Sequence, residues 1–315
     1  MSESDDRAKG SFSGYGFAFG IPGKYYSGET RHPSGPRIRA WAPVFNFPWD
    51  GGPCTISENL SLVAAGAYTE YESEDFKRFL SVEEIDECRS VEYWLDVRQS
   101  LRESISVRMR LNSFLLALWL ARPTRTYLAL RFDETDGERV VARILDRFQW
   151  IEGFVADSLS VEDIARVRAM LPSLLDIYTT SRRLRNALVL TFRARVTNDW
   201  QSSFICTAAA AEALLTCSQG PGVVHRLADA FARLTASSDR ERKDRRDLFK
   251  QLYAVRSEIM HGRSHDRRNG EANLKSLGAI HDVVRHLWNV ILDSNEIRAA
   301  LDADDESRLN LLNTL

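Results

Sequence analysis

The second half of the chain carries apolar residues at intervals of three and four, the spacing that places them on one face of an α-helix. A helix with one apolar face becomes stable when that face packs against a neighbour, so consecutive segments of this kind have to fold against each other. Five or six such segments with short connections follow Ser160 and predict an all-α bundle. Two segments show this spacing clearly: one with Val224, Leu227, Phe231 and Leu234, and one with Leu277, Ile280, Val284, Leu287 and Ile291.

The first half has a different composition, because residues 11–60 are rich in glycine, proline and aromatic residues. Such a density of turn-forming residues interrupts helices and favours short strands. Residues 125–132 (RTYLALRF) form a further candidate strand. The Ser-x-x-Glu pattern at 81–84 predicts the start of a helix, and a similar signal at Ser160 starts another, which we expect Pro172 to end.

We therefore predict an α+β protein with three parts. Residues 1–10 form a disordered leader, residues 11–155 a mixed α/β N-terminal region, and residues 156–315 the helical bundle. The N-terminal region is a candidate for recognition of a ligand or a partner, because Trp41 and Trp49 belong to a run of aromatic residues near basic ones. The alternative is that these tryptophans pack a small core.

Composition excludes several classes of protein. The formal net charge of −2 provides no basic field over the whole chain, so any site for a polyanion must be a local patch. The cysteines are far apart, which argues against a zinc ribbon and against a dense disulfide framework, and we expect neither a metal nor a cofactor. The apolar run at 113–121 is about half the length of a membrane span. We expect a cytoplasmic protein that does not contact a membrane. The cysteines are Cys54, Cys88, Cys206 and Cys217.

The segment AVRSEIMHGRS, residues 254–264, places an arginine against an apolar helix face. At about 100° per residue, Arg256 lies beside the stripe formed by Leu248, Leu252, Val255 and Ile259. A buried guanidinium requires a partner. Glu212, in FICTAAAAEALL, also lies on an apolar stripe, and its alanine neighbours would let two helices approach closely. We predict a buried Glu212–Arg256 ion pair.

His261 follows five residues after Arg256 and precedes Gly262, a natural residue for the end of a helix. In the last helical turn the free carbonyls favour an imidazolium, and Ser257, one turn earlier, is placed to bond the ring. Residues 240–268 contain ten Lys or Arg against five Asp or Glu, so positive charge gathers around this histidine. The expected RNA-phosphate contacts are Arg245, Arg246, Lys250, Arg263, Arg267 and Arg268. From geometry alone, a structural ion pair and an ordinary helix end are the favoured explanation of these residues.

The residues Arg256-Ser257-x-x-x-His261 resemble the R-(polar)-x-x-x-H motif of HEPN domains. The acidic alanine-rich helix with Glu212, followed by VRSEIMHGRS, is similar to the Apea-like HEPN subgroup, over roughly residues 160–300. The resemblance implies a helical bundle that dimerises and brings two motifs to one cleft. It implies Arg256 and His261 as a catalytic pair, with Ser257 as the polar position and Glu212 as the acidic residue.

The resemblance further implies a metal-independent endoribonuclease that cleaves RNA by attack of a 2′-hydroxyl, in antiviral defence or a toxin system. A histidine and an arginine suit that chemistry, and single-stranded or loop RNA is the expected substrate. The alternatives are a catalytically silent HEPN module that binds RNA or a partner protein as a sensor or scaffold, and a sensor whose N-terminal region binds the ligand. Expected partners are RNA, a second copy of the chain through the bundle, and a protein encoded in the same defence operon.

Overall fold

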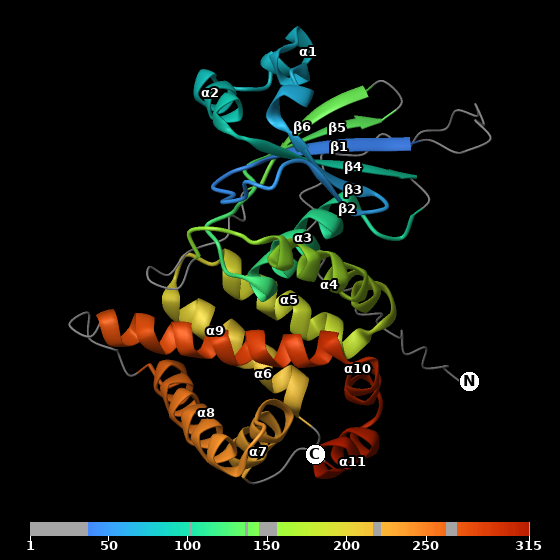
Figure 1. Cartoon of the computed structure of the whole chain (residues 1–315). Helices are drawn as coiled ribbons and strands as arrows, with labels where there is room; N and C mark the ends of the chain where they lie inside the picture. The colour runs from blue at the N-terminus through green and yellow to red at the C-terminus, as the bar shows by residue number, and fades with distance from the viewer. Residues whose placement is uncertain are drawn as a thin grey trace, which may run out of the picture. The chain divides into compact units, whose positions relative to one another are not determined.

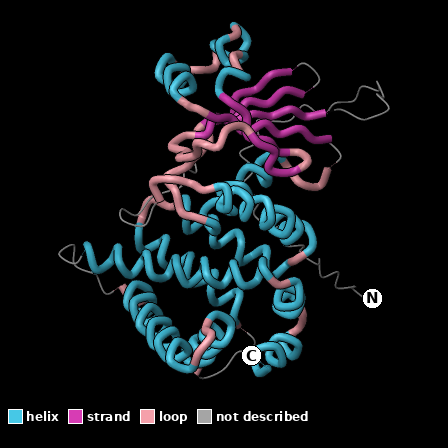
Figure 2. Tube along the Cα trace, viewed as in Figure 1, coloured by secondary structure: helices cyan, strands magenta, loops and turns pink. Residues whose placement is uncertain are grey.

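The computed structural model describes residues 37–100, 103–135, 138–144, 156–216, 222–262 and 270–314. Several predictions lie outside these residues: the leader at 1–10, the strands expected before residue 37, Cys217, and three of the expected RNA contacts, Arg263, Arg267 and Arg268. Residues 34–315 belong to one compact unit. In Figures 1 and 2 the described strands gather in one sheet and the long helices follow it.

The sheet contains six strands in the order β2-β3-β4-β1-β5-β6, and each pair of neighbours is antiparallel. The strand expected at 125–132 begins later, because Tyr127 pairs with Phe45 only as an isolated bridge before the regular ladder starts at Leu130. The strands are β1 (Arg37–Val44), β2 (Cys54–Ser57), β3 (Leu60–Ala64), β4 (Tyr93–Ser100), β5 (Leu130–Thr135) and β6 (Glu138–Arg143).

The two faces of the sheet bury different residues, as the period of two along a strand requires. On one face, Ala40, Ala42 and Leu95 join the same core as α3 (Val107–Ala121) and the helices beyond it. On the other face, Trp41, Trp94 and Phe132 pack with aromatic residues from the segment between β3 and β4. Trp41 is fully buried and Trp49 is 6% exposed, so both tryptophans are core residues rather than a recognition surface.

The segment between β3 and β4 contains two single turns and two short helices. The serine at 81 accepts a hydrogen bond from the backbone of Glu84, and the Glu84 side chain accepts one from the Ser81 N–H, so the predicted helix start is confirmed. The elements are η1 (Ala65–Ala67), η2 (Glu70–Glu72), α1 (Glu74–Lys77) and α2 (Val82–Ser90).

The described part of the chain after residue 156 is entirely helical outside its turns, which confirms the α+β class with a helical second half. Ser160 caps the first of these helices as predicted. Pro172 does not end it, because buried residues on both sides of the proline, such as Leu171 and Leu174, hold the helix against the core. The helices are α4 (Val161–Thr180), α5 (Arg182–Val196), α6 (Trp200–Leu215), α7 (Val223–Thr235), α8 (Asp239–Met260), α9 (Gly270–Asp293), α10 (Asn295–Asp302) and α11 (Asp305–Thr314).

The apolar run at 113–121 lies in α3, whose side chains are mostly buried between the sheet and α4. Among the described helices, none combines the length and the apolar character that crossing a membrane requires.

A polar cluster lies inside the helical core where α5, α6 and α9 meet. Arg195 Nη1 lies 3.3 Å from His281 Nδ1, and Ser203 Oγ lies 3.2 Å from His281 Nε2. An arginine can only donate, so Nδ1 accepts and the ring proton is on Nε2, which donates to Ser203. Ser203 in turn donates to the Ala194 carbonyl at 2.7 Å. His281 is therefore a satisfied core histidine, and burial, with Arg195 beside it, lowers its pKa well below 6.5.

This cluster predicts a pH-dependent stability. Below pH of about 6.5 the unfolded ring of His281 binds a proton that the folded ring excludes, so stability falls as pH falls toward the folded-state pKa, by up to about 1.4 kcal/mol per pH unit. His281→Gln removes the titrating group while keeping an acceptor and a donor. Its urea-unfolding free energy should depend less steeply on pH between 4.5 and 7.5, from about two units below to about one unit above the ordinary histidine value.

The exposed His286 on the same helix supplies the matched control, since His286→Gln should keep the steep dependence of the wild type. Equal slopes for wild type and His281→Gln would contradict the assignment of the neutral ring.

Candidate functional site

The candidate site lies at the contact between α6 and α8, which pack against each other. The α6 residues Ala208, Ala210 and Ala211 are buried, and their small side chains allow neighbouring helices to approach closely. Helix α8 buries Phe249 and Leu252 among its described side chains. Its predicted apolar stripe is only partly inside, because Leu248 is 37% exposed. The C-terminal half of α8 therefore lies at the edge of the core.

The predicted ion pair joins these two helices. Arg256 Nε lies 3.1 Å from Glu212 Oε1. The two side chains are 29% and 26% exposed, so the pairing is confirmed but the prediction that the pair is buried is wrong. The reason is that this part of α8 lies at the edge of the core, where Val255 and Ile259 are also only partly buried.

Tyr253 completes the arrangement and was not singled out as a site residue by the sequence. Its hydroxyl donates to Glu212 Oε1 at 3.0 Å, the same oxygen that Arg256 contacts. Its ring faces the Arg256 guanidinium at 5.2 Å from centroid to Cζ. Burial, and next the nearby Glu212 carboxylate, raise the pKa of Tyr253. The available signal was spacing, since Tyr253 lies three residues before Arg256 on the same side of the helix.

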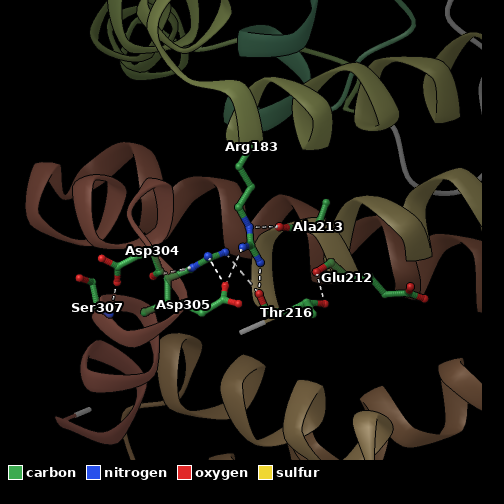
Figure 3. A network of polar contacts seen from close by, with 8 residues as sticks. Arg183, Glu212, Ala213, Thr216, Asp304, Asp305 and Ser307 are labelled. Carbon is green, nitrogen blue, oxygen red and sulfur yellow. Dashed lines mark hydrogen bonds and ion pairs between the residues drawn. The ribbon is translucent and has the colours of Figure 1, made fainter. Parts of the chain in front are cut away.

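Figure 3 shows that Arg183 contacts the turn of α6 that carries Glu212. Arg183 of α5 donates from Nε to the Ala213 carbonyl at 2.9 Å and from a terminal nitrogen to the Thr216 carbonyl. The buried Arg308 of α11 also donates to the Thr216 carbonyl, at 3.4 Å. The carbonyls at a helix end lack intrahelical donors, so these arginines cap α6 and restrain the backbone that carries Glu212.

His261 is the residue at which α8 ends. Its backbone N–H donates to the Ser257 carbonyl at 3.1 Å, its side chain is exposed, and Gly262 follows with φ of +67°, in the left-handed region that glycine adopts readily. The predicted helix end is therefore confirmed. The predicted bond between the Ser257 hydroxyl and the imidazole does not occur among the described residues, where Ser257 and His261 are joined through the backbone.

The basic residues at the start of α8 are less available than the sequence indicates. Arg245 pairs with Glu241 at 2.8 Å and also faces the Phe231 ring. Arg246 pairs with Asp229 of α7. Lys250 is partly buried. The two arginines would have to share or leave these partners to bind phosphate, and their role as RNA contacts stays a prediction.

Within the described ranges, no cluster of three or more His, Cys, Asp or Glu residues is arranged to hold a metal ion. Compared with known proteins, the chain matches no family model, no curated protein and no solved structure. Its function therefore has to be argued from the geometry of Glu212, Tyr253, Arg256 and His261.

Because the Glu212–Arg256 pair is only partly buried, its loss should lower the free energy of unfolding by a moderate amount. Glu212→Ala removes the partner of Arg256 and the acceptor of Tyr253, and should lower the free energy of unfolding by about 1–3 kcal/mol. A fully buried pair would cost about 3–5 kcal/mol. A double-mutant cycle with Arg256→Ala, measured by urea unfolding, should give a coupling energy of at least about 0.5 kcal/mol.

Glu74→Ala, which removes the highly exposed partner of Lys77, is the control and should leave stability nearly unchanged. Strictly additive effects of Glu212→Ala and Arg256→Ala would show that the contact contributes nothing.

Proposed function

We propose that this chain is an HEPN-type endoribonuclease that cleaves RNA without a metal ion. The observation that carries the proposal is an arginine held in place by a carboxylate and a tyrosine, five residues before an exposed histidine at the end of the same helix. The roles in antiviral defence or in a toxin system rest on the resemblance of the motif.

Arg256 is suited to hold a phosphodiester. Its closest approach to Glu212 is made through Nε. The opposite edge of the guanidinium, formed by the two terminal nitrogens, can therefore take two oxygen atoms of one phosphate group. These nitrogens would stabilise the negative charge that develops on the phosphorane during attack. A guanidinium already held by Glu212 and Tyr253 needs little reorganisation at that step.

His261 supplies the proton transfer. Histidine changes charge near neutral pH, and an exposed ring at a helix end can reach a bound strand. In the proposed reaction the 2′-oxygen loses its proton and attacks the adjacent phosphorus. The bond to the 5′-oxygen breaks, and that oxygen takes a proton. The products are a 2′,3′-cyclic phosphate and a free 5′-hydroxyl. In-line attack needs a flexible backbone, which favours single-stranded or loop RNA.

The reaction uses a base and an acid, and the motif provides one histidine per chain. Two copies related by a two-fold axis would provide both groups in a shared cleft. Two large apolar side chains are exposed at the ends of α8 and α9 on either side of the connection that follows His261: Met260 at 57% and Leu274 at 43%. Exposed apolar residues beside the histidine support a contact with a second copy at this end of the helices.

The proposed dimer predicts that a charge placed at Met260 separates the copies. Light scattering on the full chain should give a dimer for the wild type and a monomer for Met260→Glu, because the contact would have to bury an unpaired carboxylate. Val82→Glu, at an apolar residue that is 71% exposed near the sheet, should remain dimeric. A wild type that is monomeric at micromolar concentration would contradict the shared cleft.

Removal of the histidine tests the chemistry. His261→Ala should lower the cleavage rate of a labelled single-stranded RNA at least about 100-fold, with the fold and RNA affinity nearly unchanged, because general acid–base catalysis has that order of effect. His225→Ala, which removes an exposed histidine from α7, is the matched control and should retain activity. Wild-type activity should persist in EDTA.

Loss of activity in EDTA would overturn the metal-free mechanism. RNA binding that is never accompanied by cleavage and is unchanged by His261→Ala would favour the alternative, a silent module that binds RNA.

A further inference from the structure

We propose that Tyr253 is a positioning residue that orients Arg256 toward the scissile phosphate by holding Glu212. The inference rests on the proposed function, and it concerns a residue outside the Arg-x4-His motif. Tyr253 lies one turn before Arg256 on α8, and it reaches Glu212 on α6.

Two contacts define its role. The phenol donates its proton to Glu212 Oε1 at 3.0 Å, and Arg256 Nε lies 3.1 Å from the same oxygen. The ring also faces the guanidinium, with Cζ 5.2 Å from the ring centroid. The arginine is thus contacted at Nε by the carboxylate and at Cζ by the face of the Tyr253 ring. An arginine side chain with four free torsions has no such restraint on a bare helix surface.

Packing alone does not account for a tyrosine here. Phe249, one turn earlier on the same side of α8, is 2% exposed and stacks on Tyr253 with ring centroids 6.2 Å apart. A second phenylalanine at 253 would continue that aromatic row. The hydroxyl adds one contact, to the carboxylate that holds the arginine.

The orientation of Arg256 should affect the rate of RNA cleavage rather than the affinity for RNA. RNA affinity rests on several phosphate contacts, whereas charge on the phosphorane is stabilised only by a correctly aimed donor. Loss of the hydroxyl frees Glu212 to rotate, and Arg256 follows it. Misplacement of a donor by about 1 Å can lower a rate by about 100-fold.

The experiment compares the full-length wild type with Tyr253→Phe, which keeps the ring and removes the hydroxyl. Tyr178→Phe, on α4, is the matched control, because it removes a phenol from the same bundle at a distance from the site. We expect Tyr253→Phe to lower kcat by about tenfold with KM and melting temperature nearly unchanged. Tyr178→Phe should leave kcat unchanged.

A second measurement does not depend on activity. The Nε–H resonance of Arg256, assigned by its loss in Arg256→Lys, should shift and exchange faster with water in Tyr253→Phe and in Glu212→Gln. It should not move in Tyr178→Phe. This readout follows the orientation of the guanidinium directly.

The outcomes separate the two proposals. An unchanged Arg256 signal in Tyr253→Phe, or a kcat equal to that of the wild type, overturns the role of Tyr253. A wild type that cleaves no RNA, together with a shifted Arg256 signal in Tyr253→Phe, overturns the nuclease and supports Tyr253 as the residue that positions Arg256.

Discussion

The close packing of α6 determines much of the helical half of this protein. This helix contacts α5, α7, α8 and α9, so it has neighbours on several sides. Four helices can approach one only where the central side chains are small, and the run Ala208–Ala209–Ala210–Ala211 supplies that narrow surface. The same closeness brings Glu212, the next residue, within reach of α8.

A helix packed on several sides has to satisfy its polar groups inside the protein, and α6 does so at both ends. Near its start, Ser203 bonds His281 and the carbonyl of Ala194. At its end, Arg183 and Arg308 donate to its last free carbonyls. Unsatisfied buried groups would each cost about 1–3 kcal/mol, so these contacts are part of what allows α6 to be central. They also hold the turn that carries Glu212 in a fixed position.

Much of this arrangement could be predicted from local sequence signals, and the failures share a cause. The capping residues Ser81 and Ser160 act through bonds to residues three positions away, so sequence alone identified them. Pro172 was misjudged because tertiary packing on both sides outweighs the lost backbone bond. The strand start at Leu130 depends on which partner strand is opposite, which periodicity does not specify.

In the candidate site, too, some features could be predicted from the sequence and others depend on tertiary packing. Glu212 and Arg256 could be paired from sequence because each is a charged residue on an apolar stripe, and opposite charges inside a bundle have to meet. How deeply they are buried could not be predicted, because it depends on how far α8 lies from the core. Tyr253 was missed because a tyrosine on the apolar face of a helix is common. Its hydroxyl bonds Glu212 of another helix, and this tertiary contact cannot be inferred from the sequence around Tyr253.

The charge on α8 shows why a count of basic residues overstates affinity for a polyanion. Acidic residues are interleaved with the lysines and arginines from Asp239 to Asp247, and both Arg245 and Arg246 are engaged by carboxylates. A phosphate that approaches these arginines has to compete with a carboxylate already in place, which reduces the gain from each contact. Arg246 and Arg256 are both contacted by a carboxylate at Nε. Arg256 differs because the Tyr253 hydroxyl donates to the same carboxylate oxygen and the Tyr253 ring faces the guanidinium. An acid beside an arginine can therefore either neutralise its charge or orient it for a ligand, and the other groups that contact the pair decide which.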